Sequence, residues 1–422
     1  MDFAERRVPS GQWEEEASIA LVPIIEQWKS ETEVENAPGK DLRISAYAEA
    51  MLGLIEENEL LRYTIYDALE TRRQIVYGTS RKPDQDILPS YQSNYILRAL
   101  QKQLLHRSEE VDYPMRFTTP EPWKNFVSDL LVKPEFDAGF DEFVSDISYR
   151  NVTSNIVERG VAFPLLTAIL ADRFGKKVEV LDIGPSQNHV LIKWAIAKFS
   201  PFGDIEVEQA VSEGSKTLYA PDPLMTHYVN RLIKKGNKLA SGVGVDIMPI
   251  DVNNKEHAEV CSFYPSEYLD ETKKEAYYLL DLASPSQVSF MAADFSKLDL
   301  GLFEARYPGQ RFDIASFTTI LYQCSPRVLN AMIQNARALL KPNGLIVVQD
   351  FVQPDIKNPS HLKFYKNWFD KPYKYRTLIL DPNDPSGTFN EVFRWWNGRC
   401  KKVQVIPDAL AKLALSQQTA LS

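Results

Sequence analysis

Three acidic residues, Asp182, Asp246 and Asp294, each stand at the end of a short apolar run in the second half of the chain. A carboxylate accepts hydrogen bonds through two oxygens and donates none, so such groups can bind a hydroxyl pair, an amine or loop amides. Gly184, two residues after Asp182, permits a tight turn and a close approach of backbone to a ligand at a helix start. Each acid alone could be a solvated strand end, but their regular order predicts one shared binding site.

The elements that must position these acids are five apolar runs that alternate with helical segments after Lys177: KVEVLDIG, SGVGVDIM, VSFMAADF, RFDIASFTT and GLIVVQDF. Near-continuous apolar runs are typical of parallel strands that are buried on both faces. The carboxyl ends of such strands open into the crevice where α/β sheets bind ligands. We therefore expect a mostly parallel sheet flanked by helices, including a helix that follows Ser325-Pro326 and stops at the turn Lys341–Gly344.

Two further regions flank this pattern. Apolar residues recur at helical spacing between about residues 15 and 172, which predicts a helical N-terminal region, taken as residues 1–150, before an α/β domain at 151–422. In the C-terminal part, YKYRTLIL and KKVQVIP read as two strands that could pair antiparallel at the sheet edge. Residues 200–240 form an insertion in the alternation. The aromatic residues between the fifth run and the C-terminus could line a pocket or form a core: Trp368, Phe369, Tyr373, Tyr375, Trp395 and Trp396.

Composition narrows the classes of partner. A net charge of -9 over 422 residues argues against a surface built to neutralise phosphates, so nucleic acid is a poor candidate. The apolar stretch Val161–Ala171 is too short to cross a bilayer, and the first residues lack the apolar core of a secretory signal, so we expect a cytoplasmic protein without membrane contact. Three scattered cysteines and five scattered histidines show no metal-ligand spacing, and no metal is expected.

Residues 175–352 resemble the class I, Rossmann-like S-adenosylmethionine-dependent methyltransferases. In their DxGxGxG signature Asp182 and Gly184 match, whereas Ser186 and Asn188 stand at the later glycine positions. RFDIASFTT resembles the motif that runs beneath the donor sulfonium, and LLKPNGLIVVQDF resembles the helix-turn-strand unit beyond it. The DPPY-like motif of enzymes that methylate nucleic-acid amines is absent, since Ser316 to Thr319 occupy its place.

The resemblance implies S-adenosylmethionine as cofactor and assigns roles by position. Asp182 and Gly184 would border the methionine moiety, Asp246 would bind the ribose hydroxyls, and Asp294 with Phe295 would contact adenine. The full set of cofactor contacts expected on this basis is Asp182, Gly184, Ser186, Asp246, Ile247, Asp294, Phe295 and Ser316.

Methyl transfer from a sulfonium is an in-line displacement, which requires alignment and a dry site more than a nucleophilic side chain. Tyr322 and Asp350 are the candidate catalytic residues, because they follow the fourth and fifth runs and could hydrogen-bond an acceptor; structural polar contacts are the alternative. Gln349 is a third candidate, and Cys324 reads as a half-buried thiol.

We expect a small-molecule acceptor and a possible homodimer through the helical region. Methylation of a protein or RNA, or a catalytically silent cofactor-binding scaffold, remain the alternatives. A nicotinamide dehydrogenase ranks last, because the loop lacks GxGxxG and Asp246 falls 64 residues after Asp182, far beyond the spacing of about 20 in that fingerprint.

Overall fold

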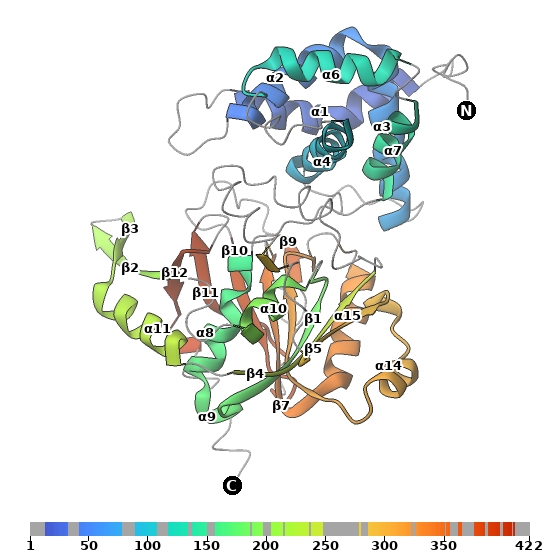
Figure 1. Cartoon of the computed structure of the whole chain (residues 1–422). Coiled ribbons are helices and arrows are strands. Elements are labelled where there is room, and N and C mark those ends of the chain that lie inside the picture. The colour runs from blue at the N-terminus through green and yellow to red at the C-terminus, as the bar shows by residue number, and fades with distance from the viewer. Residues whose placement is uncertain are drawn as a thin grey trace. The chain divides into compact units, whose positions relative to one another are not determined.

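In the computed structural model the chain forms two compact units, a helical unit and an α/β unit (Figure 1). In the parts described, the helical unit comprises residues up to Tyr149 and the α/β unit those from Val157 onward. The predicted boundary at residue 150 lies outside the described residues, and the roles predicted for the two regions remain predictions. The described residues are 13–32, 42–77, 89–107, 117–133, 137–149, 157–185, 188–196, 204–213, 216–235, 238–247, 278–279, 286–321, 324, 326–350, 352–354, 362–364, 375–384, 387–396, 400–406 and 408–409.

The helical unit consists of amphipathic helices around one apolar core. Its helices are α1 (Trp13–Thr32), α2 (Leu42–Glu57), α3 (Glu59–Tyr77), α4 (Pro89–Arg107), α6 (Pro120–Val132) and α7 (Asp137–Tyr149). α2 and α3 are separate helices, and the Asn58 side chain accepts from Leu61 N at 2.9 Å and caps the start of α3.

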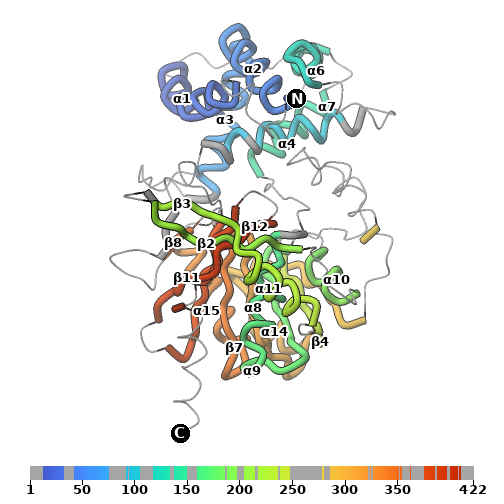
Figure 2. Tube along the Cα trace, turned by 90° about the vertical axis from the view of Figure 1, so that its left-hand side faces the viewer, coloured from blue at the N-terminus to red at the C-terminus, as the bar shows by residue number. Residues whose placement is uncertain are grey.

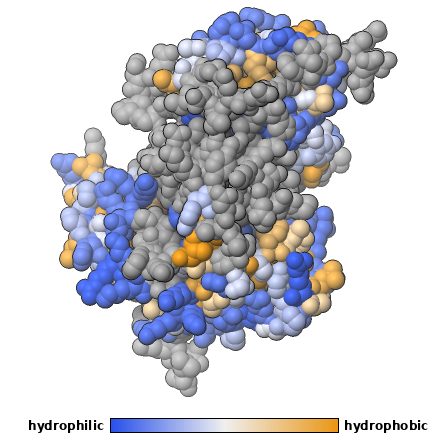
Figure 3. Space-filling model, in the orientation of Figure 1, coloured by the Kyte–Doolittle hydropathy of each residue, from blue (hydrophilic) through white to orange (hydrophobic). Residues whose placement is uncertain are grey.

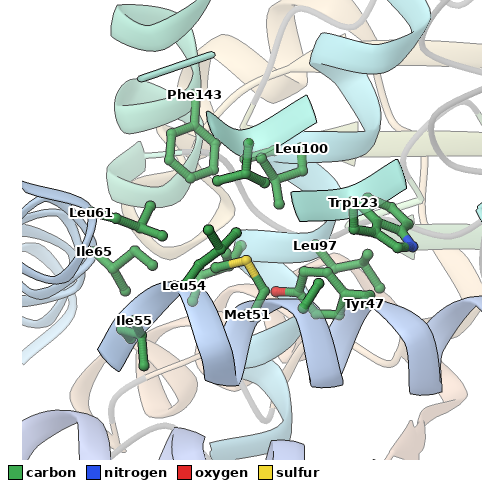
Figure 4. Close-up of a cluster of buried hydrophobic side chains, with 14 of the residues drawn as sticks. Tyr47, Met51, Leu54, Ile55, Leu61, Ile65, Leu97, Leu100, Trp123 and Phe143 are labelled. Carbon is green, nitrogen blue, oxygen red and sulfur yellow. The ribbon is translucent and has the colours of Figure 1, made fainter. Parts of the chain in front are cut away.

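Large side chains from several helices meet in that core. Tyr47 and Met51 of α2 lie close to Leu97 of α4, and Trp123 of α6 packs edge-on against Tyr47 at 5.4 Å between ring centroids (Figure 4). Burial of such aromatic and aliphatic groups is the dominant favourable term in folding. This unit therefore holds a core of its own, as an independent domain requires.

The α/β unit is organised by a ten-stranded sheet of order β3-β2-β12-β11-β10-β7-β6-β1-β4-β5. Its central strands β7, β6, β1, β4 and β5 are parallel to one another, which confirms the predicted Rossmann-like, mostly parallel sheet flanked by helices. The ten strands are β1 (Lys177–Ile183), β2 (Glu206–Glu213), β3 (Lys216–Pro221), β4 (Lys238–Asp246), β5 (Val288–Ala292), β6 (Phe312–Thr318), β7 (Leu340–Asp350), β10 (Tyr375–Leu380), β11 (Asn390–Trp396) and β12 (Lys402–Val405).

Helices cover both faces of this sheet. Alternate residues of a strand point to opposite faces. Val243 and Val245 of β4 join the core formed with α14 (Leu300–Arg306) and α15 (Pro326–Leu339), whereas Gly242 faces Leu191 of α10 (His189–Ile196). The remaining elements are η4 (Val157–Val161), α8 (Ala162–Ile169), α9 (Ala171–Phe174), α11 (Pro223–Lys235), η6 (Phe295–Lys297), and the small pair β8 (Val352–Pro354) and β9 (Leu362–Phe364). Among the described helices of both units, none is long and apolar enough to cross a membrane.

The C-terminal antiparallel strands extend beyond the predicted pair. YKYRTLIL and KKVQVIP contribute β10 and β12, but they do not pair with each other, because the aromatic segment ending at Trp396 forms β11 between them. Val392, Phe393 and Trp395 of this strand are buried, so apolar residues on both of its faces obscured the alternation of a strand. The insertion also joins the sheet, since β2 pairs in parallel with β12, and Figure 2 shows these two strands side by side.

Candidate functional site

The centre of the candidate site is a hydrogen bond between the first and fourth parallel strands. Asp182 of β1 pairs in register with Ser316 of β6, and Ser316 Oγ donates to Asp182 Oδ1 at 2.6 Å. From β1 the sheet continues through β4 and β5 on one side and through β6 and β7 on the other. Asp182 therefore lies at the topological switch point, where open α/β sheets bind their ligands.

The environment of Asp182 makes its charge costly. Burial raises the pKa of this carboxyl from its ordinary value of 3.8 to about 7; the bond from Ser316 lowers that pKa, and the nearby charge of Asp246 raises it. A cation placed beside this carboxyl would stabilise its ionised form. The site thus favours a ligand that brings a positive charge to the end of β1.

The loop after β1 adopts a backbone that few residues tolerate. Gly184 has a φ of +71° and Asn188 a φ of +62°, both in the left-handed region. Asn visits that region more readily than other residues with a Cβ, so it can replace a glycine there. The departure of Asn188 from the DxGxGxG pattern therefore keeps the backbone requirement of that position, while Ser186 lies outside the described residues.

Asn188 also contributes polar atoms to the site, a role that the sequence did not predict. Its Nδ2 donates to the Ser289 carbonyl at 3.0 Å, while its Oδ1 is buried with no hydrogen-bond partner among the described residues. Gly244 of β4 makes room for this side chain, because a Cβ there would overlap Asn188 Oδ1 and lie 2.8 Å from Pro185 Cγ. An asparagine at a position typical of glycine was the one sequence signal for this contact.

The end of β4 supplies the second predicted acid. Asp246 is the last residue of β4, pairs in register with Ala292 of β5 and is half-buried. Ile247, which follows it, is 55% exposed. A carboxylate next to an exposed aliphatic side chain can accept from hydroxyl groups and offer an apolar surface to a flat ring.

The third acid, Asp294, begins the short helix η6. Its Oδ1 accepts from Ser296 N at 3.0 Å and from Ser296 Oγ at 2.7 Å, and its Oδ2 lies 3.3 Å from Lys297 Nζ. Phe295 is buried in the core, with its ring 6.4 Å from that of Phe317 in an edge-on contact. The structure therefore gives Asp294 a capping role and Phe295 a packing role, and their predicted contacts with adenine remain predictions.

The loop after β6 folds over the loop after β1. Thr319 has a φ of +51°, and its N–H donates to the Gln349 carbonyl at 2.8 Å. Leu321 N donates to Asp350 Oδ2 at 2.7 Å, and the Ile320 side chain fills the space that a Cβ on Gly184 would need. The fully buried Asp350 thus holds a loop in place; its predicted catalytic role remains a prediction, and Tyr322 lies outside the described residues.

The remaining candidate residues, Gln349 and Cys324, make contacts within the fold. Gln349 is buried, and its Nε2 donates to Cys400 Sγ at 3.2 Å. Burial, with the charges of Asp350 and Asp294, raises the pKa of the Cys324 thiol to about 12, so this cysteine stays neutral at physiological pH. Within the described parts of the chain, no group of three His, Cys, Asp or Glu side chains could hold a metal ion.

Comparisons with known proteins give likeness only at the level of solved structures. No family model matches the chain, and no curated protein does. A protein named PKMT2 from Rickettsia typhi is 16% identical with a TM-score of 0.24, over 49% of this chain and 27% of that one. A methyltransferase from Thiobacillus denitrificans with bound S-adenosylhomocysteine is 16% identical with a TM-score of 0.22, over 49% and 58%. This chain therefore spans about a quarter and just over half of their lengths.

A third structure covers more of both chains. An O-methyltransferase family protein from Burkholderia thailandensis is 12% identical with a TM-score of 0.25, over 82% of this chain and 78% of that one. Two of these three structures are thus methyltransferases in name, and one of them is named as S-adenosylmethionine-dependent.

Proposed function

We propose that the α/β unit binds S-adenosylmethionine at the carboxyl ends of β1, β4 and β5 and transfers its methyl group to a small-molecule acceptor. The observation that carries this proposal is the buried Asp182 at the switch point, bonded to Ser316 and followed by a left-handed glycine. S-adenosylmethionine carries an ammonium and a sulfonium, and a cation next to Asp182 would stabilise the ionised form of this carboxyl.

The polar groups around Asp182 match the donors of the cofactor. The ligand ammonium can donate to Asp182 at the end of β1 and to the buried Asn188 Oδ1 in the loop that follows this strand. Asp246 can accept both ribose hydroxyls in bidentate fashion, and the exposed Ile247 can pack on the adenine ring. Asp294 Oδ2 can accept from the adenine amine, because its ion pair with Lys297 is formed by a side chain that is 83% exposed and free to move.

Bound S-adenosylmethionine supplies an electrophilic methyl group on a positively charged sulfur. The protein has to exclude water and hold the two reactants in line. Ile320, seated against Gly184, places an apolar side chain over the β1 loop, and Asp350 fixes this arrangement through Leu321 N. We infer that these residues position the reactants rather than exchange protons with them.

The first test is isothermal titration calorimetry of the full chain with S-adenosylmethionine and S-adenosylhomocysteine. We expect Asp246→Ala and Asp294→Ala each to weaken binding by about 1 to 3 kcal/mol, the loss for a buried hydrogen-bonded group. Asp299→Ala is the matched control, because Asp299 caps α14 through Gly301 N and Leu302 N as Asp294 caps η6, but lies outside the proposed site. Its binding should equal that of the wild type.

Each outcome leads to a different conclusion. Binding that is absent, or indifferent to both substitutions at the site, rejects the cofactor. Tight binding of the cofactor without release of S-adenosylhomocysteine in an acceptor screen would identify a silent scaffold. A protein or RNA acceptor would be indicated if label from the methyl group entered macromolecules and not small metabolites. NADH is titrated as a further ligand. Binding of NADH without binding of either sulfur ligand would favour the dehydrogenase alternative.

A further inference from the structure

The insertion after α10 forms a two-stranded ribbon at one end of the large sheet. β2 pairs with β12 over only two residue pairs, Lys402 with Glu206 and Val403 with Val207, and from Glu208 onward it pairs only with β3. β3 ends the strand order of the sheet, and no described strand pairs with its other edge. An unpaired edge presents a row of backbone donors and acceptors that can pair with another chain.

Apolar side chains gather on and next to this ribbon. Four of the eight exposed large hydrophobic residues described in the α/β unit lie between residues 211 and 228: Val211, Leu218, Leu224 and Tyr228. Val211 and Leu218 are 41% and 44% exposed although they face each other across the ribbon. Figure 3 shows this projecting part of the unit as mostly hydrophilic surface with small apolar spots. A two-stranded ribbon is marginally stable alone, so a further strand would stabilise it.

The residue order of β3 is self-complementary when the strand is laid antiparallel against a copy of itself. In such a pair, residues that lie opposite each other share one face of the sheet only if the twofold axis passes between two copies of the same residue. A shift of one residue would exchange the two faces of the strand. Centred on Leu218, the pairing sets Leu218 opposite Leu218, Tyr219 opposite Thr217, and Lys216, the one charged residue of the strand, opposite Ala220.

We propose that two copies of this chain associate through β3, antiparallel and centred on Leu218, so that the sheets of two α/β units become one continuous sheet. On one face the row Val211, Leu218, Leu218 and Val211 then crosses four strands, which covers the exposed apolar pair of each ribbon. No like charges lie opposite each other, because Lys216 faces Ala220 of the second copy and Glu213 of its own ribbon. The twofold axis makes the contact closed, as in most homodimers.

The test is sedimentation velocity of the full chain at concentrations between about 1 and 100 µM, where association appears as a concentration-dependent shift. We expect a species of twice the 48.2 kDa of one chain. Leu218→Lys and Leu218→Glu should each raise the dimer dissociation constant at least about tenfold, because like charges then meet across the axis. An equimolar mixture of the two variants should dimerise again, since lysine then faces glutamate.

The controls separate this surface from others. Leu302→Lys changes a residue that is 64% exposed on α14 of the same unit, and it should leave the dimer intact. Circular dichroism should show unchanged folding for every variant, because Leu218 is exposed in the single chain. A wild-type protein that stays monomeric at the highest concentration overturns the proposal. So does a dimer that survives both charged variants, or a mixture that fails to restore one, because contact then runs through another surface or register.

Discussion

The helical unit and the α/β unit both pair buried charges, as Arg173 and Asp381 do at 2.8 Å in the α/β unit, but the α/β unit also buries an acid beside a second acid. In the helical unit the buried Lys102 binds Glu142 and lies 3.3 Å from Asp146, and Arg72 Nε donates to the Ile147 carbonyl at 2.5 Å. In the α/β unit the buried Asp182 faces the like charge of Asp246. Every described residue with a positive φ also belongs to the α/β unit.

This difference shows where the molecule accepts unfavourable energy. Paired charges and regular helices serve stability, whereas strained backbone and poorly compensated acids persist only where surrounding structure enforces them, and such places cluster at ligand sites. Three of the seven described residues with a positive φ, Gly184, Asn188 and Thr319, lie at the carboxyl ends of β1 and β6. These two strand ends therefore combine left-handed backbone with the buried Asp182.

Removal of a buried positive charge from the helical unit should have the largest effect on stability. We expect Lys102→Met to lower the free energy of unfolding by about 3 kcal/mol, because Asp146, whose side chain is 10% exposed, loses the ion pair with Lys102 in a nearly buried setting. Lys133→Met, which breaks an exposed pair with Asp129, should cost less than about 1 kcal/mol. Urea denaturation measures both. Equal losses would show that the buried network contributes no more than a surface pair.

Removal of a buried negative charge from the α/β unit should raise the free energy of unfolding. The folded chain holds the proton of Asp182 up to a pH of about 7 and the unfolded chain only to about 3.8, so the free energy of unfolding falls as pH rises between these values. Asp182→Asn should therefore stabilise the ligand-free chain by about 2 to 4 kcal/mol at pH 8, and by less at pH 5. Urea denaturation at both pH values tests this. A loss of stability at pH 8 would mean that the charge is compensated in the folded chain.

Two glycines with the same backbone angle sharpen the comparison further. Gly184→Ala should cost about 2 to 3 kcal/mol, because a Cβ adds overlap with Ile320 to the strain of a positive φ. Gly309→Ala carries the same strain at a φ of +67° with no neighbouring atom within 4 Å, and should cost about 1 to 2 kcal/mol. Thermal unfolding compares the two. If Gly184→Ala/Ile320→Ala recovers none of the difference, the contact with Ile320 is not its cause.

The smallest effect is expected for a change that keeps an acceptor at position 350. Asparagine can still accept from Leu321 N, so Asp350→Asn should bind S-adenosylhomocysteine within about twofold of the wild type, whereas Asp350→Ala should bind about tenfold more weakly. Turnover, once an acceptor is known, should follow the same order. If Asp350→Asn instead retained binding and lost about a hundredfold or more in turnover, Asp350 would be a general base as the sequence suggested.

The sequence revealed the local features of the fold and site, because they depend on neighbouring residues. Apolar runs that end in acids placed Asp182, Asp246 and Asp294 at or just beyond three strand ends, where the structure has them. The start of the helix at Pro326 was predicted from its proline and is confirmed. These features arise from strand burial and helix capping, which single segments encode. The turn predicted at Lys341–Gly344 was wrong, because these residues belong to β7 (Leu340–Asp350), which begins directly after the helix.

Contacts between distant segments could not be predicted in the same way. Ile320 fills the space that a Cβ on Gly184 would need, and Asn188 fills the corresponding space next to Gly244. Both contacts depend on strand register and on loop paths. β11 was missed because Val392, Phe393 and Trp395 are apolar residues that occupy both faces of one strand. Such features follow from tertiary packing, which overrides local propensity.

The short parallel pairing of β2 with β12 sets an order of events during synthesis. Glu206 and its partner Lys402 are separated by 196 positions, which a ribosome adds in about 10 to 40 s at 5 to 20 residues per second. For most of that interval β2 and β3 are already made, but β12, the strand that attaches them to the sheet, does not yet exist. The nascent chain therefore carries this two-stranded ribbon unattached to the sheet until β12 has been synthesised.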